Sequence, residues 1–438
     1  MTDKQIPKPR PSIQTALPAL LLGTATFNTQ YVADPHSMPY RDIVARAISL
    51  GVTGFDTSPY YGPSEVLLGE ALNALFTSPS DPLSRESIFL VTKAGRIAGD
   101  EFDYSPAWIR YSILRSLKRL HTAYLDLVYM HDVEFVPPAD VLTAVRELRR
   151  LRDEEGVIRY VGISGFPAGV LAELAEMVLR ETGEPLDAVL SYGHFTVQNR
   201  KLALPWVTEG GEQQEDLRKS SPLVRLKEAG VHVVLNASIL GMGLLTRRGI
   251  PADPETPAGA DSPFTKWHPS PSGLRLACKN LADIAEAAGE RLESVAIRWA
   301  LEEWARVGAA AGLGVDITSH AVPERRRVGA TVCGVTSIPE LEETVAEWQD
   351  VLAGLDRASE SNGGCYGTER QKKVLELVKN ELWPALGTWI DFVWDSPGEG
   401  YVNTRRPEDK GRVPDDGIIA AFELSKNSEE NVGTQKPE

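Results

Sequence analysis

The chain has few cysteines, no excess of positive charge and no long apolar run, and each shortage excludes a class of protein. Only three of its 438 residues are cysteines, and neither their odd number nor their spacing fits a disulfide framework or a metal site. The net charge of -15 argues against nucleic acid or a membrane surface as a partner. No stretch approaches the ~18 apolar residues of a membrane span, and the first residues lack a secretory signal. We therefore expect a cytoplasmic protein that acts on a small molecule, as a monomer or weak homodimer.

Short apolar runs alternate with segments whose apolar residues have helical spacing, and this alternation predicts the fold. The runs expected to form buried strands are 17–24, 53–57, 87–93, 125–131, 158–164, 188–192, 231–236 and 331–335. Eight such strands, each followed by a helix, predict a closed (β/α)8 TIM barrel with additional loops and C-terminal helices. The alternative is a doubly wound open sheet, which would favour a glycine fingerprint after the first strand. The sequence Gly-Thr-Ala-Thr-Phe at 23–27 is not such a fingerprint.

The composition also divides the chain into a barrel and its additions. Residues 1–16 are polar and contain prolines, which predicts a flexible arm. The barrel is expected over 17–395, ending in a further helix at 366–394, with a polar tail at 396–438 that we expect to be disordered. Three insertions interrupt the barrel, near 208–220, 246–272 and 306–330. The second is long and follows a strand, a position in which loops are often functional.

Four reactive side chains lie at or just after successive strand ends, namely Asp56, Tyr61, Lys93 and His131. Singly, each has an ordinary structural explanation, as a cap, a packed ring or a residue emerging into solvent. The carboxyl ends of barrel strands share one face, however, so the four are expected to meet there. An ammonium beside the phenol is expected to lower the pKa of Tyr61 by about 1–3 units. Such a site would polarise a carbonyl or deprotonate an alcohol while a nicotinamide carries the hydride.

The motif around the first two of these residues resembles a known family. Residues 54–72, Gly-Phe-Asp-Thr-Ser-Pro-Tyr-Tyr-Gly-Pro-Ser-Glu-Val-Leu-Leu-Gly-Glu-Ala-Leu, look like the signature of the aldo-keto reductases. Val-Thr-Lys93 and Tyr-Met-His131 fall where that family keeps its lysine and histidine, and the likeness runs from about 20 to 348. The resemblance implies a (β/α)8 barrel in which Tyr61 is the general acid/base, Lys93 and Asp56 tune it, and His131 positions the substrate carbonyl.

Further segments narrow the resemblance to one branch. The stretch 236–246, the Trp-His-Pro of 267–269 and the Trp-Asp-Ser-Pro of 394–397 look most like the L-galactose and fungal D-arabinose dehydrogenases. That branch oxidises the anomeric carbon of an aldose to a lactone. The chain departs from the usual family residues at Ala237, Ile239, Gly165 and Ser191. The resemblance implies that the substrate contacts are Phe27, Tyr60, Trp108, His131, Trp267 and His268.

The resemblance also implies where a nicotinamide cofactor binds. The expected cofactor contacts are Gly23, Thr24, Asp56, Ser164, Gly165, Ser191, Ser238, Leu240, Gly241, Gly334, Thr336, Glu340, Glu343 and Thr344. NADP-preferring members place a lysine at the position of Gly334 and an arginine at that of Glu340 to bind the 2′-phosphate. Because a carboxylate would repel a phosphate but accept a hydrogen bond from a 2′-hydroxyl, we predict NAD rather than NADP. The structural alternative is that Glu340 has no role in cofactor binding and is exposed to solvent in the first turn of a helix, where the helix dipole favours a carboxylate.

The leading interpretation is an NAD-dependent aldose 1-dehydrogenase in which Tyr61 accepts the hydroxyl proton. Within the same class, the chain could be an aldehyde or pyridoxal reductase that works in the opposite direction. From a different class, it could be a regulatory protein that keeps the barrel but turns over little, as the potassium-channel β-subunits of the family largely do. The complete set of four residues argues against the last alternative.

Overall fold

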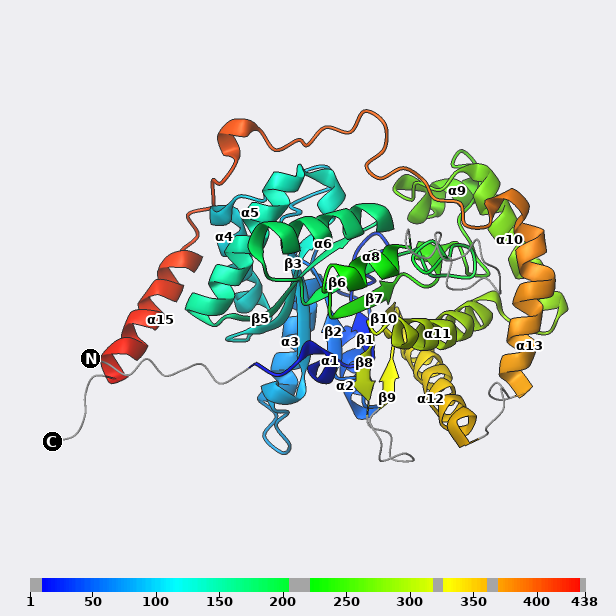
Figure 1. Ribbon diagram of the computed structural model, residues 1–438, viewed down its shortest axis with the longest axis horizontal. Helices are drawn as coiled ribbons and strands as arrows, with labels where there is room; N and C mark the ends of the chain where they lie inside the picture. The colour runs from blue at the N-terminus through cyan, green and yellow to red at the C-terminus, as the bar shows by residue number, and fades with distance from the viewer. Residues whose placement is uncertain (1–9, 205–220, 318–325, 361–368, 434–438) are drawn as a thin grey trace.

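The computed structural model describes residues 10–204, 221–317, 326–360 and 369–433. Eight parallel strands close into a barrel in the order β1-β10-β7-β6-β5-β4-β3-β2, and Figure 1 shows them at the centre with helices around them. The strands are β1 (Leu20–Gly23), β2 (Gly54–Asp56), β3 (Phe89–Ala94), β4 (Leu125–His131), β5 (Ile158–Gly165), β6 (Ala188–Tyr192), β7 (Val233–Ala237) and β10 (Ala330–Gly334). The (β/α)8 barrel is confirmed, and the closed strand order excludes the open sheet.

The helices that cover the barrel follow the strands along the chain. They are α2 (Tyr40–Ser49), α3 (Ser64–Phe76), α4 (Pro106–Arg119), α5 (Pro138–Arg150), α6 (Ala168–Thr182), α8 (Pro222–Glu228), α10 (Ser272–Ala287), α11 (Leu292–Ala310) and α12 (Ile338–Glu360). In α5, a proline opens the first turn, and Val141, Val145 and Leu148 recur at helical spacing on its buried face. Burying each of these side chains stabilises the fold by about 1.5–3 kcal/mol. The helix packs against β4 and β5, which carry the histidine side of the site.

The register of the strands brings the reactive residues to one end of the barrel. Asp56 of β2 pairs with Gly23 of β1 and with Val91 of β3. Lys93 of β3 pairs with Tyr129 of β4, and His131 closes β4 opposite Ser164 of β5. Parallel pairing therefore places the carboxyl ends of β2, β3 and β4 side by side, which is where barrel enzymes carry their chemistry.

The predicted flexible arm is wrong for its second half, residues 10–16. These residues include helix α1 (Ile13–Ala16), capped by the Ser12 side chain, and Ile13 is buried. The Tyr160 hydroxyl donates to the carbonyl of Pro11 (2.7 Å), and the Gln14 amide donates to the carbonyl of His232 (2.9 Å). The polar composition of this segment did not predict its packing, because the residues that bind it are far away in the sequence. Residues 1–9 lie outside the described part of the chain.

The insertions take different forms. The long loop after β7 contains 3₁₀ turns at Gly241–Gly243 and Phe264–Lys266 and the short helix α9 (Pro257–Asp261). Within 306–330, α11 continues to Ala310 and an antiparallel hairpin follows, β8 (Val315–Ile317) with β9 (Arg326–Val328). The insertion predicted at 208–220 lies outside the described residues.

The single helix predicted at 366–394 is broken in the structure. Helix α13 (Glu369–Leu377) passes through a π-helical turn (Val378–Leu382) into α14 (Trp383–Leu386). The helical path then ends because Gly387 adopts φ of 52° and ψ of -123°, a conformation that glycine alone adopts readily.

The tail predicted to be disordered is instead packed on the barrel as far as the structure describes it. Just before the tail, Arg200 forms a 2.6 Å ion pair with Asp391, and the Trp394 ring stacks on Phe166 (4.8 Å, 12°). Beyond them, Arg405 pairs with Asp103 (3.2 Å), and helix α15 (Ile418–Gly433) packs on α4. Figure 1 shows this segment arching over the barrel before it descends to α15. The composition of the segment predicted disorder, but a few widely spaced side chains hold this polar segment against the rest of the protein.

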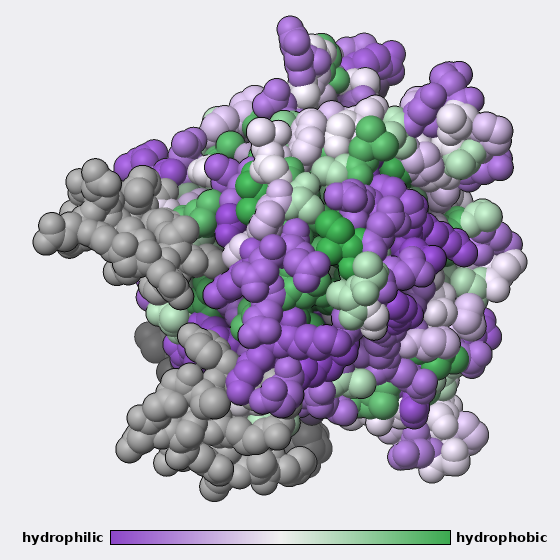
Figure 2. All heavy atoms as spheres, turned by 90° about the vertical axis from the view of Figure 1, so that its right-hand side faces the viewer, coloured by the Kyte–Doolittle hydropathy of each residue, from purple (hydrophilic) through white to green (hydrophobic). Residues whose placement is uncertain are grey.

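The surface is largely hydrophilic on the side of the molecule that carries α10 and α13. Figure 2 shows that hydrophilic side chains cover most of this face, with apolar groups scattered between them. None of the helices in the described ranges combines the length and apolar character needed to cross a membrane.

Candidate active site

The site is built on a buried ion pair between neighbouring strands. Lys93 Nζ lies 2.6 Å from Asp56 Oδ1 and also donates to the carbonyl oxygen of Thr57 (3.0 Å). Only 2% of the lysine side chain and 6% of the aspartate side chain are exposed. Burial raises the pKa of Asp56, and the charge of Lys93 opposes that rise. The pair thus holds an ammonium in place at the barrel mouth, as the sequence predicted.

Tyr61 lies above this pair, in the loop that leads from β2 to α3. The ammonium of Lys93 is 4.9 Å from the centre of its ring, and the ring is perpendicular to that of His131 at 5.7 Å. The expectation of a lowered pKa is not met, since burial, followed by the charges of Asp56 and Asp132, raises the pKa of Tyr61 well above its ordinary range. Burial is the largest of these causes, and the carboxylate of Asp56, which lies beside the ammonium, adds to it. Tyr61 is therefore a neutral phenol that can donate a proton.

His131 completes the group of four from the end of β4. Its Nδ1 lies 3.0 Å from the Ser58 hydroxyl, and its Nε2 lies 3.6 Å from a carboxylate oxygen of Asp132. Burial lowers the pKa of His131 to about 3, so the ring is neutral at physiological pH. A neutral imidazole beside a phenol can hold an uncharged substrate oxygen. The four residues that the sequence predicted to meet do so.

A second ion pair beside His131 was missed by the sequence analysis. Arg96 contacts Asp132, and its guanidinium lies 3.8 Å from the centre of the Tyr60 ring. Burial alone would raise the pKa of Asp132, but the positive charges around it, Arg96 among them, outweigh it and hold the pKa below its usual range. The available signal was position, because Asp132 directly follows His131 and Arg96 lies three residues after Lys93. Their meeting depends on Asp132 taking a left-handed backbone (φ 56°).

Aromatic rings form a wall next to the phenol. Tyr60 lies 6.1 Å from Tyr61 and 5.8 Å from His131, measured between ring centres. Tyr31, which the sequence analysis also missed, has its pKa raised by burial and then by Tyr61 and Tyr60. Its ring is 5.7 Å from that of Trp267, whose indole donates to the carbonyl of Gln30 (3.3 Å). Tyr60 thus lies beside the phenol, Trp267 lies beside Tyr31, and their contacts with substrate stay predictions.

The other predicted substrate contacts occupy different surroundings. Phe27 is completely buried and its ring packs near Tyr40 of α2 (6.5 Å). Trp108 is on α4, where Arg405 of the C-terminal segment covers its ring at 4.7 Å. Roles for these two side chains in substrate binding stay predictions.

His268 has both ring nitrogens engaged within the protein. Nε2 donates to the carbonyl of Gly241 (3.1 Å), Nδ1 accepts from the amide of Ser270 (3.1 Å), and burial lowers the pKa to about 4. The ring therefore fastens the loop after β7, and a direct contact with substrate stays a prediction.

The ends of β5 and β6 carry polar atoms that suit a bound cofactor. Gly165 pairs with Ser191 across the strands, and Ser164 donates to the carbonyl of Met130 (3.3 Å). A side chain at Gly165 would begin 2.4 Å from Glu134 Oε2, which explains the glycine at this position. Among the described residues, neither Glu134 Oε2 nor Ser191 Oγ has a hydrogen-bond partner, although both atoms are buried. Such orphaned atoms call for a polar ligand group, and the residues present therefore fit a nicotinamide cofactor.

The loop after β7 has an unusual backbone at the predicted cofactor contacts. Ser238, Gly241, Met242 and Gly243 all have positive φ, at 56°, 57°, 54° and 103°. Two of the four are not glycine, so this turn stores strain of order 1–3 kcal/mol at each such residue. The loop is held by tight turns, including the bond from the Gly241 amide to the Ser238 carbonyl (2.8 Å). Strain retained beside a strand end is typical of ligand-binding segments.

The last turn, after β10, engages its acidic side chains within the protein. Glu340 accepts from the Thr336 amide (2.7 Å) and hydroxyl (3.0 Å). Glu343 accepts from Ser294 (2.6 Å) and pairs with Arg291. The Thr344 hydroxyl donates to the carbonyl of its own helix at Glu340 (2.8 Å).

At the first strand, the two predicted contacts fit tightly between neighbours. Thr24 is completely buried and donates to the carbonyl of Asp56 (3.1 Å). A side chain at Gly23 would begin 2.9 Å from Val332 of β10, and Gly334 pairs with Gly23 in the same register. The predicted cofactor contacts thus lie at strand ends, in the turns that follow them or, for Glu340, Glu343 and Thr344, at the start of α12, and their roles stay predictions.

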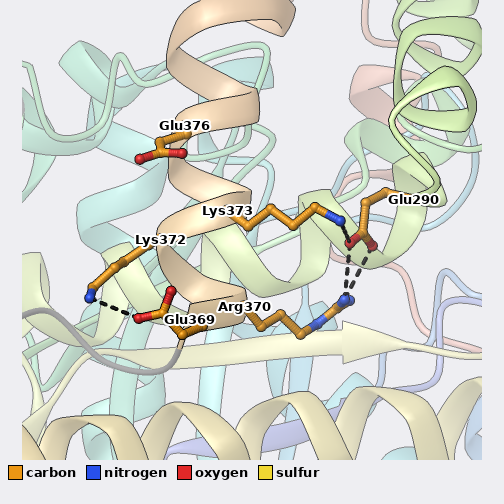
Figure 3. Close-up of a pocket in the computed structure, with 6 residues that line it drawn as sticks. All are labelled: Glu290, Glu369, Arg370, Lys372, Lys373 and Glu376. Atoms are coloured by element: carbon orange, nitrogen blue, oxygen red, sulfur yellow. Dashed lines mark hydrogen bonds and ion pairs between the residues drawn. The ribbon is translucent and has the colours of Figure 1, made fainter.

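A surface hollow elsewhere does not compete with this site. It is lined by Glu290, Glu369, Arg370, Lys372, Lys373 and Glu376. Figure 3 shows Arg370 and Lys373 of α13 pointing toward Glu290, with which they pair at 3.2 and 3.6 Å. No strand end contributes to it, and its three basic side chains are paired with Glu290 or Glu369. Among the residues that the structure describes, no group of three or more His, Cys, Asp or Glu could hold a metal ion.

Comparisons with known proteins identify relatives of this chain. The D-arabinose 1-dehydrogenase of Saccharomyces cerevisiae is 37% identical over 366 residues, which are 83% of this chain and 92% of that protein. The L-galactose dehydrogenase of Arabidopsis thaliana is 30% identical over 346 residues, or 78% and 86% of the two chains. A solved glycerol dehydrogenase from Gluconobacter oxydans shares the fold with a TM-score of 0.51 and 22% identity, covering 88% of this chain and 96% of that one.

A model of the whole family provides the remaining comparison. The aldo/keto reductase model matches residues 19–357, which span every strand of the barrel. Together with the site at the carboxyl ends of β2, β3 and β4, this match shows that the chain belongs to the aldo/keto reductase family, and it is an NAD(P)-dependent oxidoreductase.

Proposed function

We propose that the protein is an NAD-dependent aldose 1-dehydrogenase that oxidises the anomeric carbon of a sugar to a lactone. The observation that carries the proposal is the placement of Tyr61 and His131 at right angles above the Lys93–Asp56 pair. The names of the two relatives, a D-arabinose and an L-galactose dehydrogenase, support an aldose as the substrate. The aromatic wall formed by Tyr60 and its neighbours suits the apolar face of a sugar ring.

Residues of this chain would bind the C1 hydroxyl of the sugar and accept its proton. His131 would hold the C1 hydroxyl by a hydrogen bond, and Tyr61 would take the hydroxyl proton as the C1–O bond becomes a carbonyl. Tyr61 would first release its own proton to solvent, Lys93 would stabilise the phenolate that takes the substrate proton, and Asp56 would fix the ammonium. A bound nicotinamide supplies the acceptor for the C1 hydride. The residues that would hold it are Ser164, Gly165, Ser191 and the loops after β7 and β10.

NAD is proposed over NADP on the basis of charge in the last turn. The positions Gly334 and Glu340 supply no cation for a 2′-phosphate, and the carboxylate of Glu340 lies beside the Thr336 amide. Two cations that contact helix α12, Arg291 and Arg46, are already paired with Glu343 and Glu342. A 2′-phosphate would therefore meet uncompensated negative charge.

The reverse reaction, reduction of an aldehyde such as pyridoxal, is the second candidate. It is favoured by the raised pKa of Tyr61, because a neutral phenol donates a proton to a developing alkoxide more readily than it accepts one. Both directions use the same four residues, so their relative rates decide between them.

A substrate and cofactor panel tests the proposal. Initial rates would be measured with D-arabinose, L-galactose and L-fucose, each with NAD and with NADP, and with pyridoxal and the reduced cofactors. The proposal expects the highest kcat/KM for an aldose with NAD. Preference for NADP would refute the cofactor assignment, and faster pyridoxal reduction would establish the second candidate.

A further inference from the structure

The environment of His131 is asymmetric, with a different kind of partner at each ring nitrogen. Nδ1 lies 3.0 Å from a hydroxyl, that of Ser58. Nε2 lies 3.6 Å from a carboxylate oxygen, that of Asp132. A neutral imidazole has one proton, and its two nitrogens then behave as one donor and one acceptor. Which nitrogen carries the proton decides what His131 can offer to a substrate.

The hydroxyl of Ser58 favours an unprotonated Nδ1. Its oxygen already accepts a hydrogen bond from the backbone amide of Tyr60 (3.1 Å). The Ser58 proton remains to be donated, and Nδ1 of His131 is the acceptor in reach. Both groups are buried, so water does not compete for this bond.

The carboxylate of Asp132 favours a proton on Nε2. Asp132 is 2% exposed and its charge is held by Arg96, which also donates to the carbonyl of Gly99 (2.8 Å). With the proton on Nδ1, the lone pair of Nε2 would face this carboxylate in a buried site, where like partial charges repel strongly. With the proton on Nε2, the positive end of the N–H dipole lies near the negative charge, while the 3.6 Å separation is too long for a hydrogen bond and leaves the N–H able to donate to a substrate oxygen.

We propose that Asp132, held by Arg96, acts together with Ser58 as a pair of positioning residues that keep the single proton of His131 on Nε2, so that His131 donates to the reacting oxygen of the substrate. The proposal rests on the proposed function, because it assigns His131 the role of holding that oxygen. The groups that face the ring, from all elements packed around it, are Ser58, Tyr60, Tyr61, Lys93, Arg96 and Asp132.

Asp132 occupies a position that is unfavourable both for its backbone and for one of its carboxylate oxygens. Asp132 adopts a left-handed backbone, which is unfavourable for a residue with a side chain by about 1 kcal/mol or more. One of its oxygens, Oδ1, is buried without a hydrogen-bond partner among the described residues. Strain and an unsatisfied atom that persist beside a reactive ring are typical of a site organised for function.

The test is the position of the proton, read by ¹⁵N NMR of histidine-labelled protein. The chain has seven histidines, and the signals of His131 would be assigned by their loss in His131→Gln. The wild-type spectrum at pH 7 is expected to show the Nε2–H tautomer. A proton on Nδ1 overturns the proposal whichever substrate the enzyme uses, so this result is independent of the proposed function.

The Asp132→Asn variant provides a second test, by its histidine tautomer and its kcat. An amide can donate to Nε2, so the variant is expected to move the proton to Nδ1 and to lower kcat by about 10²-fold, the low end for losing one donor to a developing charge. The dissociation constant for NAD should stay within twofold, and Asp132→Glu, which keeps the charge, should restore the Nε2–H signal. Asp153→Asn, which removes a carboxylate paired with Arg152 at the surface, is the matched control. An unchanged tautomer in Asp132→Asn would overturn the proposal.

Discussion

Breaking the Lys93–Asp56 pair should cost far more than breaking an ion pair at the surface. The two charged atoms are 2.6 Å apart, and both side chains are almost completely buried. At an effective dielectric constant of about 20, their attraction is about 6 kcal/mol, which offsets the cost of removing both charges from water. Asp56→Asn would leave a buried ammonium without its partner, and Lys93→Met a buried carboxylate.

Each single substitution is therefore expected to lower the free energy of unfolding by about 3–5 kcal/mol. The double substitution should cost about 2–3 kcal/mol less than the sum, because it leaves no unpaired charge. The assay is urea unfolding at pH 7, followed by tryptophan fluorescence, since the chain has nine tryptophans.

The matched control is the pair formed by Arg225 and Glu176. It has a similar distance, 2.8 Å, but its side chains are 26% and 39% exposed. Its coupling energy in the same kind of cycle should fall below about 1 kcal/mol. If the coupling between Asp56 and Lys93 were no larger than this, the account of a buried, mutually dependent pair would be refuted.

Three further predictions concern other parts of the molecule. Gly165→Ala should lower the free energy of unfolding by about 1–3 kcal/mol, because the new methyl group would lie 2.4 Å from Glu134 Oε2, and urea unfolding would show this; an unchanged midpoint would contradict the packing. Burial lowers the pKa of His131, His194 and His268 to about 3 or 4, so the unfolded state binds more protons than the folded state below pH 6.5, and the free energy of unfolding should fall as the pH drops from 6.5 toward 4. The His268→Gln variant should show a weaker dependence of the free energy of unfolding on pH, and the same dependence as in the wild type would contradict this explanation. Asp391→Ala should free the C-terminal segment from Arg200, and faster proteolysis after residue 390 than in the wild type would be the sign; an unchanged rate would show that this ion pair is dispensable.

The barrel and its reactive residues could be predicted because both depend on local patterns. Apolar runs of five to eight residues identified the strands, and parallel strands must bring their carboxyl ends to one face. Asp56, Lys93 and His131 sit at or beside those ends, so their meeting followed from topology alone.

The parts that the sequence did not reveal depend on contacts across long separations. Arg405 meets Asp103 across about 300 residues, and nothing in the polar tail marks that partner. Asp132 was overlooked because its role depends on a left-handed backbone that turns its carboxylate toward Arg96. The pKa of Tyr61 was predicted in the wrong direction, because the sequence shows that a lysine is near but shows neither the desolvation of the phenol nor the nearby charges of Asp56 and Asp132.

The most direct test of the central claim is the steady-state rate of Tyr61→Phe with NAD and the best aldose. The account predicts that kcat falls by at least about 10²-fold, because the variant removes only the hydroxyl that exchanges the proton. The dissociation constant for NAD, measured separately by fluorescence, should remain unchanged. Wild-type turnover in this variant would contradict the claim that Tyr61 is the general acid/base.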